Sequence, residues 1–397
     1  MQHPIPTGFR LAGVHCGIKR KATNEDLALV VCDAPAVAAG VYTKNIVRAA
    51  PVILDEQRTP TDQFHVLVIN SGNANACTGD QGMRDAEQMT QLAADACRAA
   101  HDAALVLSTG VIGVLMPMEK VQQGIAAAAA QLSNDEASLI AAARGIMTTD
   151  TCRKIASRQI ETSTGKVSIC GIAKGSGMIG PNMATMLAVI MTDAKLGAND
   201  AQAMLTEVTD DSFNSISVDG HTSTNDTALL LASGQVGTAP LAGAELASFK
   251  NALLEVCVEL ARMIADDGEG ATHLITIRVN GCATLADARR IAQSVANSPL
   301  VKTAIAGNDP NWGRIVSAAG YSGVDFAAEG VSLHVNGFLL YEQGTPAEFD
   351  DPKVSASIAA SRETDVELTF SEGSAGCRFW TCDLTTEYVH INADYRT

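Results

Sequence analysis

The sequence predicts a mixed α/β or α+β fold. Strand-like apolar segments alternate with amphipathic helical segments along 397 residues, a pattern typical of sheets layered against helices. The length exceeds that of one small core and indicates two domains or one large two-part sandwich. Hydrophobic residues make up 47% of the chain and aromatic residues only 4%, so Ala, Val, Ile and Leu must provide most of the core packing.

The predicted strands are apolar segments bounded by turn residues. The segment Val331–Tyr341 contains Asn336-Gly337, a pair typical of the turn of a β-hairpin. We expect a terminal meander from the last three strands of the chain. In order, the other predicted strands are Phe64–Asn70, Ala103–Leu107, Val167–Ala173, Met186–Thr192, His273–Val279, Asp365–Phe370, Cys377–Leu384 and Glu387–Ile391.

The predicted helices combine helical spacing of apolar residues with start and stop signals. Pro117 suits a first helical turn, because proline lacks an N–H that this position leaves unused. Asn199 is an expected N-cap, and Gly268 is the expected end of the longest helix. The predicted helices are Met83–Ala100, Pro117–Leu132, Ala201–Val208, Ala244–Ile264, Leu285–Ala306 and Pro352–Ala360.

Charge and composition exclude several classes of protein. Acidic residues outnumber basic residues 44 to 28, so the chain lacks the positive surface that a nucleic acid requires. No apolar stretch approaches the length of a membrane span, and the first ten residues do not resemble a targeting signal, so we expect a soluble cytoplasmic protein. The ten cysteines form no CxxC pair, which disfavours a disulfide framework or a metal site.

The central segment Lys174–Leu187, KGSGMIGPNMATML, permits two interpretations. Gly175, Gly177 and Gly180 fit the GxGxxG pattern of a dinucleotide-binding loop, which would make the protein a nucleotide-dependent oxidoreductase that binds NAD or FAD. That interpretation requires a helix directly after the glycines, so that its N-terminal amides bind phosphate. The sequence continues instead with Pro181 and a segment that favours a strand.

The second interpretation is a cleavage site followed by a nucleophile. A Thr that begins a strand can attack the carbonyl of the preceding residue, here Ala184, and water then releases the ester. Thr185 would thereby gain a free α-amine with an unperturbed pKa of roughly 8, able to accept the proton of its own hydroxyl. This chemistry requires no histidine, but an Ala-Thr pair at a strand start is usually only structural.

Motifs in the same order along nearly the whole chain resemble the ArgJ family, the ornithine acetyltransferases (glutamate N-acetyltransferases). KGSGMIGPNMATML is similar to the cleavage and nucleophile segment of that family. The other matching segments are GFRLAGVHCGIKRKATNEDLALV near the start, VINSGNANACTG, LSTGVIG, MTTDT, DDGEGATH, GNDPNWGR and the terminal NADYRT. A mild departure is His273, where the family pattern suggests Lys.

The resemblance implies an ArgJ/DmpA-like α-β-β-α sandwich and cleavage between Ala184 and Thr185. Residues 1–184 would form an α chain and residues 185–397 a β chain; together they would make one interwoven sandwich, assembled as α2β2. The implied reaction moves acetyl from N-acetylornithine to glutamate and yields ornithine and N-acetylglutamate. No metal or organic cofactor is implied, and acetyl-CoA is left open as a second acetyl donor.

The resemblance also implies roles for individual residues. Thr185 is the nucleophile with its α-amine as base, and Thr109 and Gly110 form the oxyanion hole. The implied substrate contacts are Thr151, Lys174, Thr185, Glu269, Asn392 and Thr397. His221 is interpreted as a surface group. A third hypothesis is a non-catalytic binding protein that keeps the fold without transferring acetyl groups.

Overall fold

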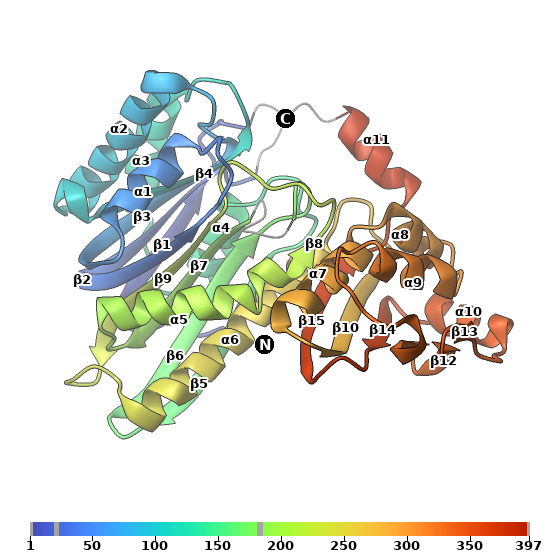
Figure 1. Cartoon of the computed structure of the whole chain (residues 1–397). Helices are drawn as coiled ribbons and strands as arrows, with labels where there is room; N and C mark the ends of the chain where they lie inside the picture. Colours follow the sequence, from blue (N-terminus) through green and yellow to red (C-terminus); the bar gives the residue numbers. More distant parts are fainter. Residues whose placement is uncertain (1–2, 20–23, 181–185, 395–397) are drawn as a thin grey trace.

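The structure is a computed structural model that describes residues 3–19, 24–180 and 186–394. Three residues with predicted roles, Ala184, Thr185 and Thr397, lie outside the described residues. Figure 1 shows a larger region formed mainly by the first two thirds of the chain, beside a smaller region formed by the last third.

The larger region contains one eight-stranded sheet in the order β4-β3-β2-β9-β7-β6-β5, with β1 paired to β2. The long strand β2 shifts register between Val31 and Ala36. Its first part pairs with β1 and β3, and its last part pairs with β9 while Ala36 and Ala38 still pair with β3. The sheet therefore has two halves joined through β2. The strands are β1 Phe9–Val14, β2 Leu27–Tyr42, β3 Thr61–Asn73, β4 Ala104–Val111, β5 Lys154–Thr162, β6 Gly165–Lys174, β7 Leu187–Ala194 and β9 Thr227–Val236.

The two halves of this sheet pack face to face. Val30 and Cys32 of β2 share one core with Val189 and Leu229 of the other half, and α4 (Glu136–Gly145) closes that core through Leu139. The helices α2 (Gly79–Cys97) and α3 (Met118–Ala129) cover one outer face, with α1 (Ala50–Arg58) beside them. The helices α5 (Ala198–Asp210) and α6 (Gly243–Asp266) cover the other. This order of layers confirms the predicted α-β-β-α sandwich.

The smaller region is built on a seven-stranded sheet in the order β13-β12-β11-β14-β10-β15-β8. Its core is shared with α7 (Leu285–Ala296), α8 (Pro299–Ala306), α9 (Trp312–Gly320) and α10 (Asp351–Ala359). The sequence analysis did not separate this region from the sandwich. Its strands are β8 Ile216–Ser217, β10 Leu274–Cys282, β11 Ser332–Val335, β12 Phe338–Glu342, β13 Thr345–Pro346, β14 Glu363–Thr369 and β15 Ala375–Cys382.

Most predicted elements are confirmed, including the hairpin, in which Asn336 and Gly337 both have positive φ. Four predictions are wrong. The chain does not end in a meander, because β10 lies between β14 and β15 in the sheet. The strand Glu387–Ile391 lies within a helix, α11 (Thr386–Asp394), because a short apolar alternation cannot be told from a helical turn. Pro299, capped by Ser298, starts a new helix inside Leu285–Ala306. Asn199 lies inside α5, whose N-cap is Gly197.

No helix in the described ranges is long and apolar enough to cross a membrane.

Candidate active site

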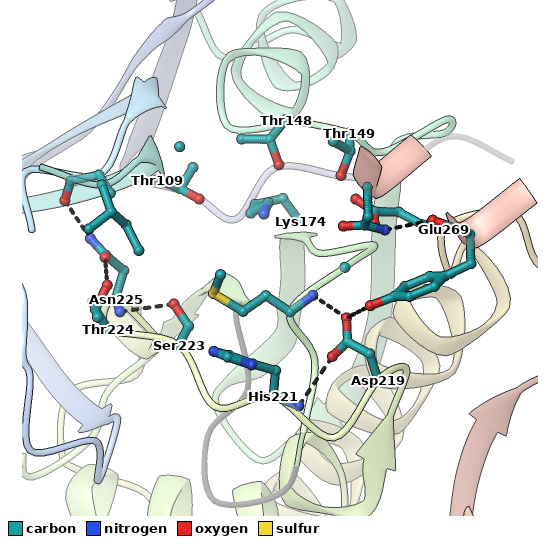
Figure 2. A pocket seen from close by; sticks show the side chains of 17 residues that line it. Thr109, Thr148, Thr149, Lys174, Asp219, His221, Ser223, Thr224, Asn225 and Glu269 are labelled. Atoms are coloured by element: carbon teal, nitrogen blue, oxygen red, sulfur yellow. Dashed lines mark hydrogen bonds between the residues drawn. The ribbon is translucent and has the colours of Figure 1, made fainter. Parts of the chain in front are cut away.

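A cavity of about 220 Å³ opens where β4 and β6 end and β9 begins (Figure 2). Residues from both sides of position 184 line it. They are Ala74, Thr109, Gly110, Ile112, Thr148, Thr149, Lys174, Gly177, Met178, Asp219, His221, Ser223, Thr224, Asn225, Glu269, Tyr388 and Asn392.

Five residues with predicted roles meet at this cavity, although they are far apart in the chain. They are Thr109, Gly110, Lys174, Glu269 and Asn392. Thr151 does not line the cavity: its N–H lies 3.0 Å from Oδ2 of Asp267, and its hydroxyl donates to Oδ1 of the same residue. The nearby threonines at the cavity wall are Thr148 and Thr149.

The glycine-rich loop after β6 serves close packing rather than phosphate binding. A Cβ at Gly177 would lie 2.4 Å from the Glu269 carboxylate, and a Cβ at Gly180 would lie 2.5 Å from the carbonyl carbon of Gly220. The next described element is strand β7, not a helix. With an acidic group against the loop, and a strand rather than a helix as the next described element, the oxidoreductase interpretation is without support.

Lys174 places a buried positive charge in the cavity wall. Its side chain is almost fully buried, and its charge interacts with the carboxylates of Asp150, Asp226 and Glu269. Burial lowers the pKa of Lys174, while the nearby carboxylate of Asp150 opposes that shift. Because Lys174 lines the cavity, its ammonium can bind a ligand carboxylate.

Behind Lys174 lies a buried ionic network centred on Lys154. Nζ of Lys154 lies 2.7 Å from Oδ1 of Asp150 and 2.6 Å from Oδ2 of Asp267, and its side chain is fully buried. Burial alone would raise the pKa of Asp150, but Lys174 and Lys154 lower it to about 2. Asp150 also accepts the Gly175 N–H at 2.7 Å, so the network supports the start of the glycine loop.

Replacing Lys154 with Met will destabilise the protein by about 3–5 kcal/mol, because two buried carboxylates would lose their shared cation. Urea unfolding measures this loss. The matched control is Lys166→Met, which removes an exposed lysine 4.0 Å from Glu161 and should leave stability unchanged. Equal stabilities of the two variants would contradict a structural role for the network.

Asn225 holds the end of β4, where the predicted oxyanion hole lies. Its Nδ2 donates to the carbonyl oxygens of Ala74 at 2.7 Å and Ser108 at 2.8 Å. Ser108 also donates through its hydroxyl to Oδ1 of Asn70 at 2.6 Å. The backbone just before Thr109 is therefore fixed on both sides, which is the preorganisation that an oxyanion hole needs.

Acidic side chains and a tyrosine occupy the side of the cavity next to α11. Nδ2 of Asn392 donates to Oε2 of Glu269 at 2.8 Å, and the Tyr388 hydroxyl donates to Oδ2 of Asp219 at 3.1 Å. Asp219 also accepts the N–H groups of Met178 and Ile179. Figure 2 shows Glu269 and Asp219 on the same side of the cavity, away from Thr109.

Several cavity residues have no role predicted from the sequence, among them Asp219, Asn225 and Tyr388. His221, interpreted as a surface group, also lines the cavity. The available signal was the polar run Asp219–Asp226, DGHTSTND, which directly precedes an apolar strand. A cavity role for Tyr388 was not predictable, because the segment Glu387–Ile391 is predicted as a strand and forms part of α11.

Comparison with known proteins agrees with this architecture. Residues 10–397 match the ArgJ family. The "Arginine biosynthesis bifunctional protein ArgJ" of Rhodopirellula baltica is 47% identical over 100% of this chain and 97% of its own length. The protein of the same name from Symbiobacterium thermophilum is 48% identical over 99% of this chain and 98% of its own length.

A solved structure of an arginine biosynthesis bifunctional protein ArgJ from Bacillus halodurans is also similar. Its chain is 38% identical, with a TM-score of 0.51, and the match covers 52% of this chain and 98% of that chain. The family match extends over nearly all of the sequence, and the two curated relatives are similar from end to end. The chain therefore belongs to the ArgJ family of arginine-biosynthesis acyltransferases.

Proposed function

We propose that this chain is a self-cleaving acetyltransferase that moves acetyl from N-acetylornithine to glutamate through an acetyl-Thr185 intermediate. One observation carries the proposal: Thr109, Gly110, Lys174, Glu269 and Asn392 line a single cavity. Met186, the residue after Thr185, is held at the start of β9, which borders this cavity.

The charges of the cavity suit an acylated basic amino acid. The buried ammonium of Lys174 matches a substrate carboxylate. Glu269 and Asp219 on the α11 side match the side-chain ammonium of ornithine, and Asn392 and Tyr388 orient these two carboxylates through hydrogen bonds. Thr151 acts indirectly in this scheme, because its polar groups bond to Asp267.

The reaction uses the Thr185 hydroxyl twice. During maturation the hydroxyl attacks the Ala184 carbonyl, the peptide bond becomes an ester, and water releases the α-amine of Thr185. In catalysis the same hydroxyl attacks the acetyl group while Thr109 and Gly110 stabilise the negative charge on the acetyl oxygen. Ornithine leaves, and the amine of glutamate then takes the acetyl group, which makes the kinetics ping-pong.

Two features of the relatives support this scheme. The match to the solved Bacillus halodurans chain covers 98% of that chain but only 52% of this one. Such a difference is expected if the solved chain is one product of cleavage. The curated relatives are named bifunctional, which favours acetyl-CoA as a second acetyl donor. The α2β2 assembly, the cytoplasmic location and the absence of a metal or organic cofactor remain predictions from the sequence.

Intact-mass spectrometry of the purified protein tests the proposal. We expect two species that sum to the full chain plus one water, the second of them starting at Thr185. Addition of N-acetylornithine should add one acetyl group to the second species only. Active enzyme with a single uncleaved chain would contradict the proposal, and cleaved protein that never becomes acetylated would favour the non-catalytic hypothesis.

A further inference from the structure

Asp226 is a buried carboxylate for which the reaction above has no role. It directly precedes β9, is 0% exposed, and accepts the Met186 N–H at 3.0 Å through Oδ1. Its Oδ2 is buried without a hydrogen-bond partner in the described part of the chain. The Thr43 hydroxyl donates to the Ser223 carbonyl oxygen at 2.8 Å; Thr43 and the Ser223 N–H lie close enough to lower the pKa of Asp226 but make no hydrogen bond of normal geometry to Oδ2. Such an unpaired buried oxygen is unfavourable and requires an explanation.

The register of the sheet places Asp226 beside Met186, the residue that follows the proposed nucleophile in the chain. Leu187, the first residue of β7, pairs with Lys174 on β6 and with Thr227 on β9. Met186 is held at both of its backbone polar groups, because its carbonyl oxygen accepts the Thr227 N–H at 3.1 Å. Asp226 therefore binds the residue that directly follows Thr185.

Lys174 is the cation that acts on the Asp226 carboxylate, and a second cation near Oδ2 would stabilise its ionised form. Burial raises the pKa of Asp226 well above its usual range, and the Lys174 ammonium opposes that shift. A cation close to Oδ2 would stabilise the ionised carboxylate further. The other charged or titratable groups around Lys174 and the cavity are Lys19, Asp150, Lys154, Asp219, His221, Glu269 and Tyr388.

We propose that the Asp226 carboxylate binds and orients the α-amino group that cleavage before Thr185 creates. This inference rests on the proposed function, in which that amine is the base. Asp226 would act on the amine as the carboxylate of a catalytic triad acts on its histidine, by orientation and charge, without taking the proton.

The proton balance of the step is complete without another reactant. As Thr185 Oγ bonds to the acetyl carbon, its proton passes to the α-amine, and the resulting ammonium is stabilised by Asp226. The bond between the acetyl carbon and the ornithine nitrogen then breaks. The ammonium returns the proton to the leaving nitrogen, so Asp226 stays ionised throughout.

The test is Asp226→Asn, which keeps the volume and an acceptor for the Met186 N–H but removes the charge. In matured enzyme we expect acetylation of the β chain to slow about 100-fold. The acidic limb of kcat/KM against pH should also move to lower pH, because an ammonium beside a neutral amide loses its proton more easily. Rapid-mixing mass spectrometry and pH profiles measure the two effects.

Asp55→Asn is the matched control. Asp55 is equally buried, burial raises its pKa, and it accepts a strand amide, the Val106 N–H, at 3.0 Å, but it does not line the cavity. We expect this variant to lower the melting temperature without moving the pH profile. A structural role for Asp226 would make its Asn variant behave in the same way, and that result would overturn the proposal.

If Asp226→Asn stays uncleaved, Asp226→Glu takes its place in the test, because it retains the charge. A Glu variant that matures and keeps the wild-type acidic limb would support the proposal, and one that matures with a shifted limb or does not mature would overturn it. Failure of the proposed function is distinguishable, since wild-type enzyme would then carry no acetyl group on the β chain.

Discussion

Thr185→Ala will remain a single chain of 397 residues and will transfer no acetyl group. The variant lacks the hydroxyl that both breaks the Ala184–Thr185 bond and carries the acetyl group. Loss of a nucleophile lowers the rate by at least about 10⁴-fold. Denaturing electrophoresis measures maturation, and the transfer of labelled acetyl from N-acetylornithine to glutamate measures activity.

Two further variants show whether the effect is specific to this hydroxyl. Thr185→Ser keeps a hydroxyl and should still mature, although at a different rate. Thr192→Ala removes a buried hydroxyl from β7, one that donates to the Ser168 carbonyl oxygen at 2.8 Å. It should lower stability while cleavage and transfer continue. A cleaved, active Thr185→Ala protein would disprove the proposed mechanism.

Gly110→Ala will reduce kcat/KM for acetyl transfer by about 100-fold to 1000-fold, the usual effect of losing an oxyanion-hole donor. Gly110 has a φ of +134°, and an added Cβ would lie 2.4 Å from the carbonyl carbon of Gly72 and 2.6 Å from the Asn73 nitrogen. The backbone at the end of β4 would have to move, and Thr109 and Gly110 would leave their places at the cavity. Steady-state kinetics with both substrates measures this loss.

Gly113→Ala is the control for backbone strain in the same segment. Gly113 also has a positive φ, +79°, but an added Cβ would have no atom within 4 Å. The substitution should cost about 1–2 kcal/mol of stability, from the left-handed conformation alone, and leave the transfer rate unchanged. If Gly110→Ala transferred acetyl at the wild-type rate, Thr109 and Gly110 would not form the oxyanion hole.

Local sequence patterns predicted much of the sandwich and part of the cavity. The Asn336-Gly337 hairpin was predictable because two adjacent residues determine its turn. The motif containing Lys174 and Gly177 located one wall of the cavity. The family resemblance implies a substrate contact at Thr151; in the structure its N–H and hydroxyl bond to Asp267, and its neighbours Thr148 and Thr149 line the cavity. Residue type alone could not reveal that difference in orientation.

The sequence by itself determined the family, because ordered motifs lie within short segments. The resemblance to that family then implied the layered fold and the five predicted residues that meet at the cavity. Only the tertiary structure decided that β2 joins two facing half-sheets. It also decided that Asn225 bonds to Ser108 on β4 and that Asp226 bonds to Met186, just before β7. These contacts join residues many positions apart. They depend on strand order and register, which long-range packing of the core selects and no local pattern records.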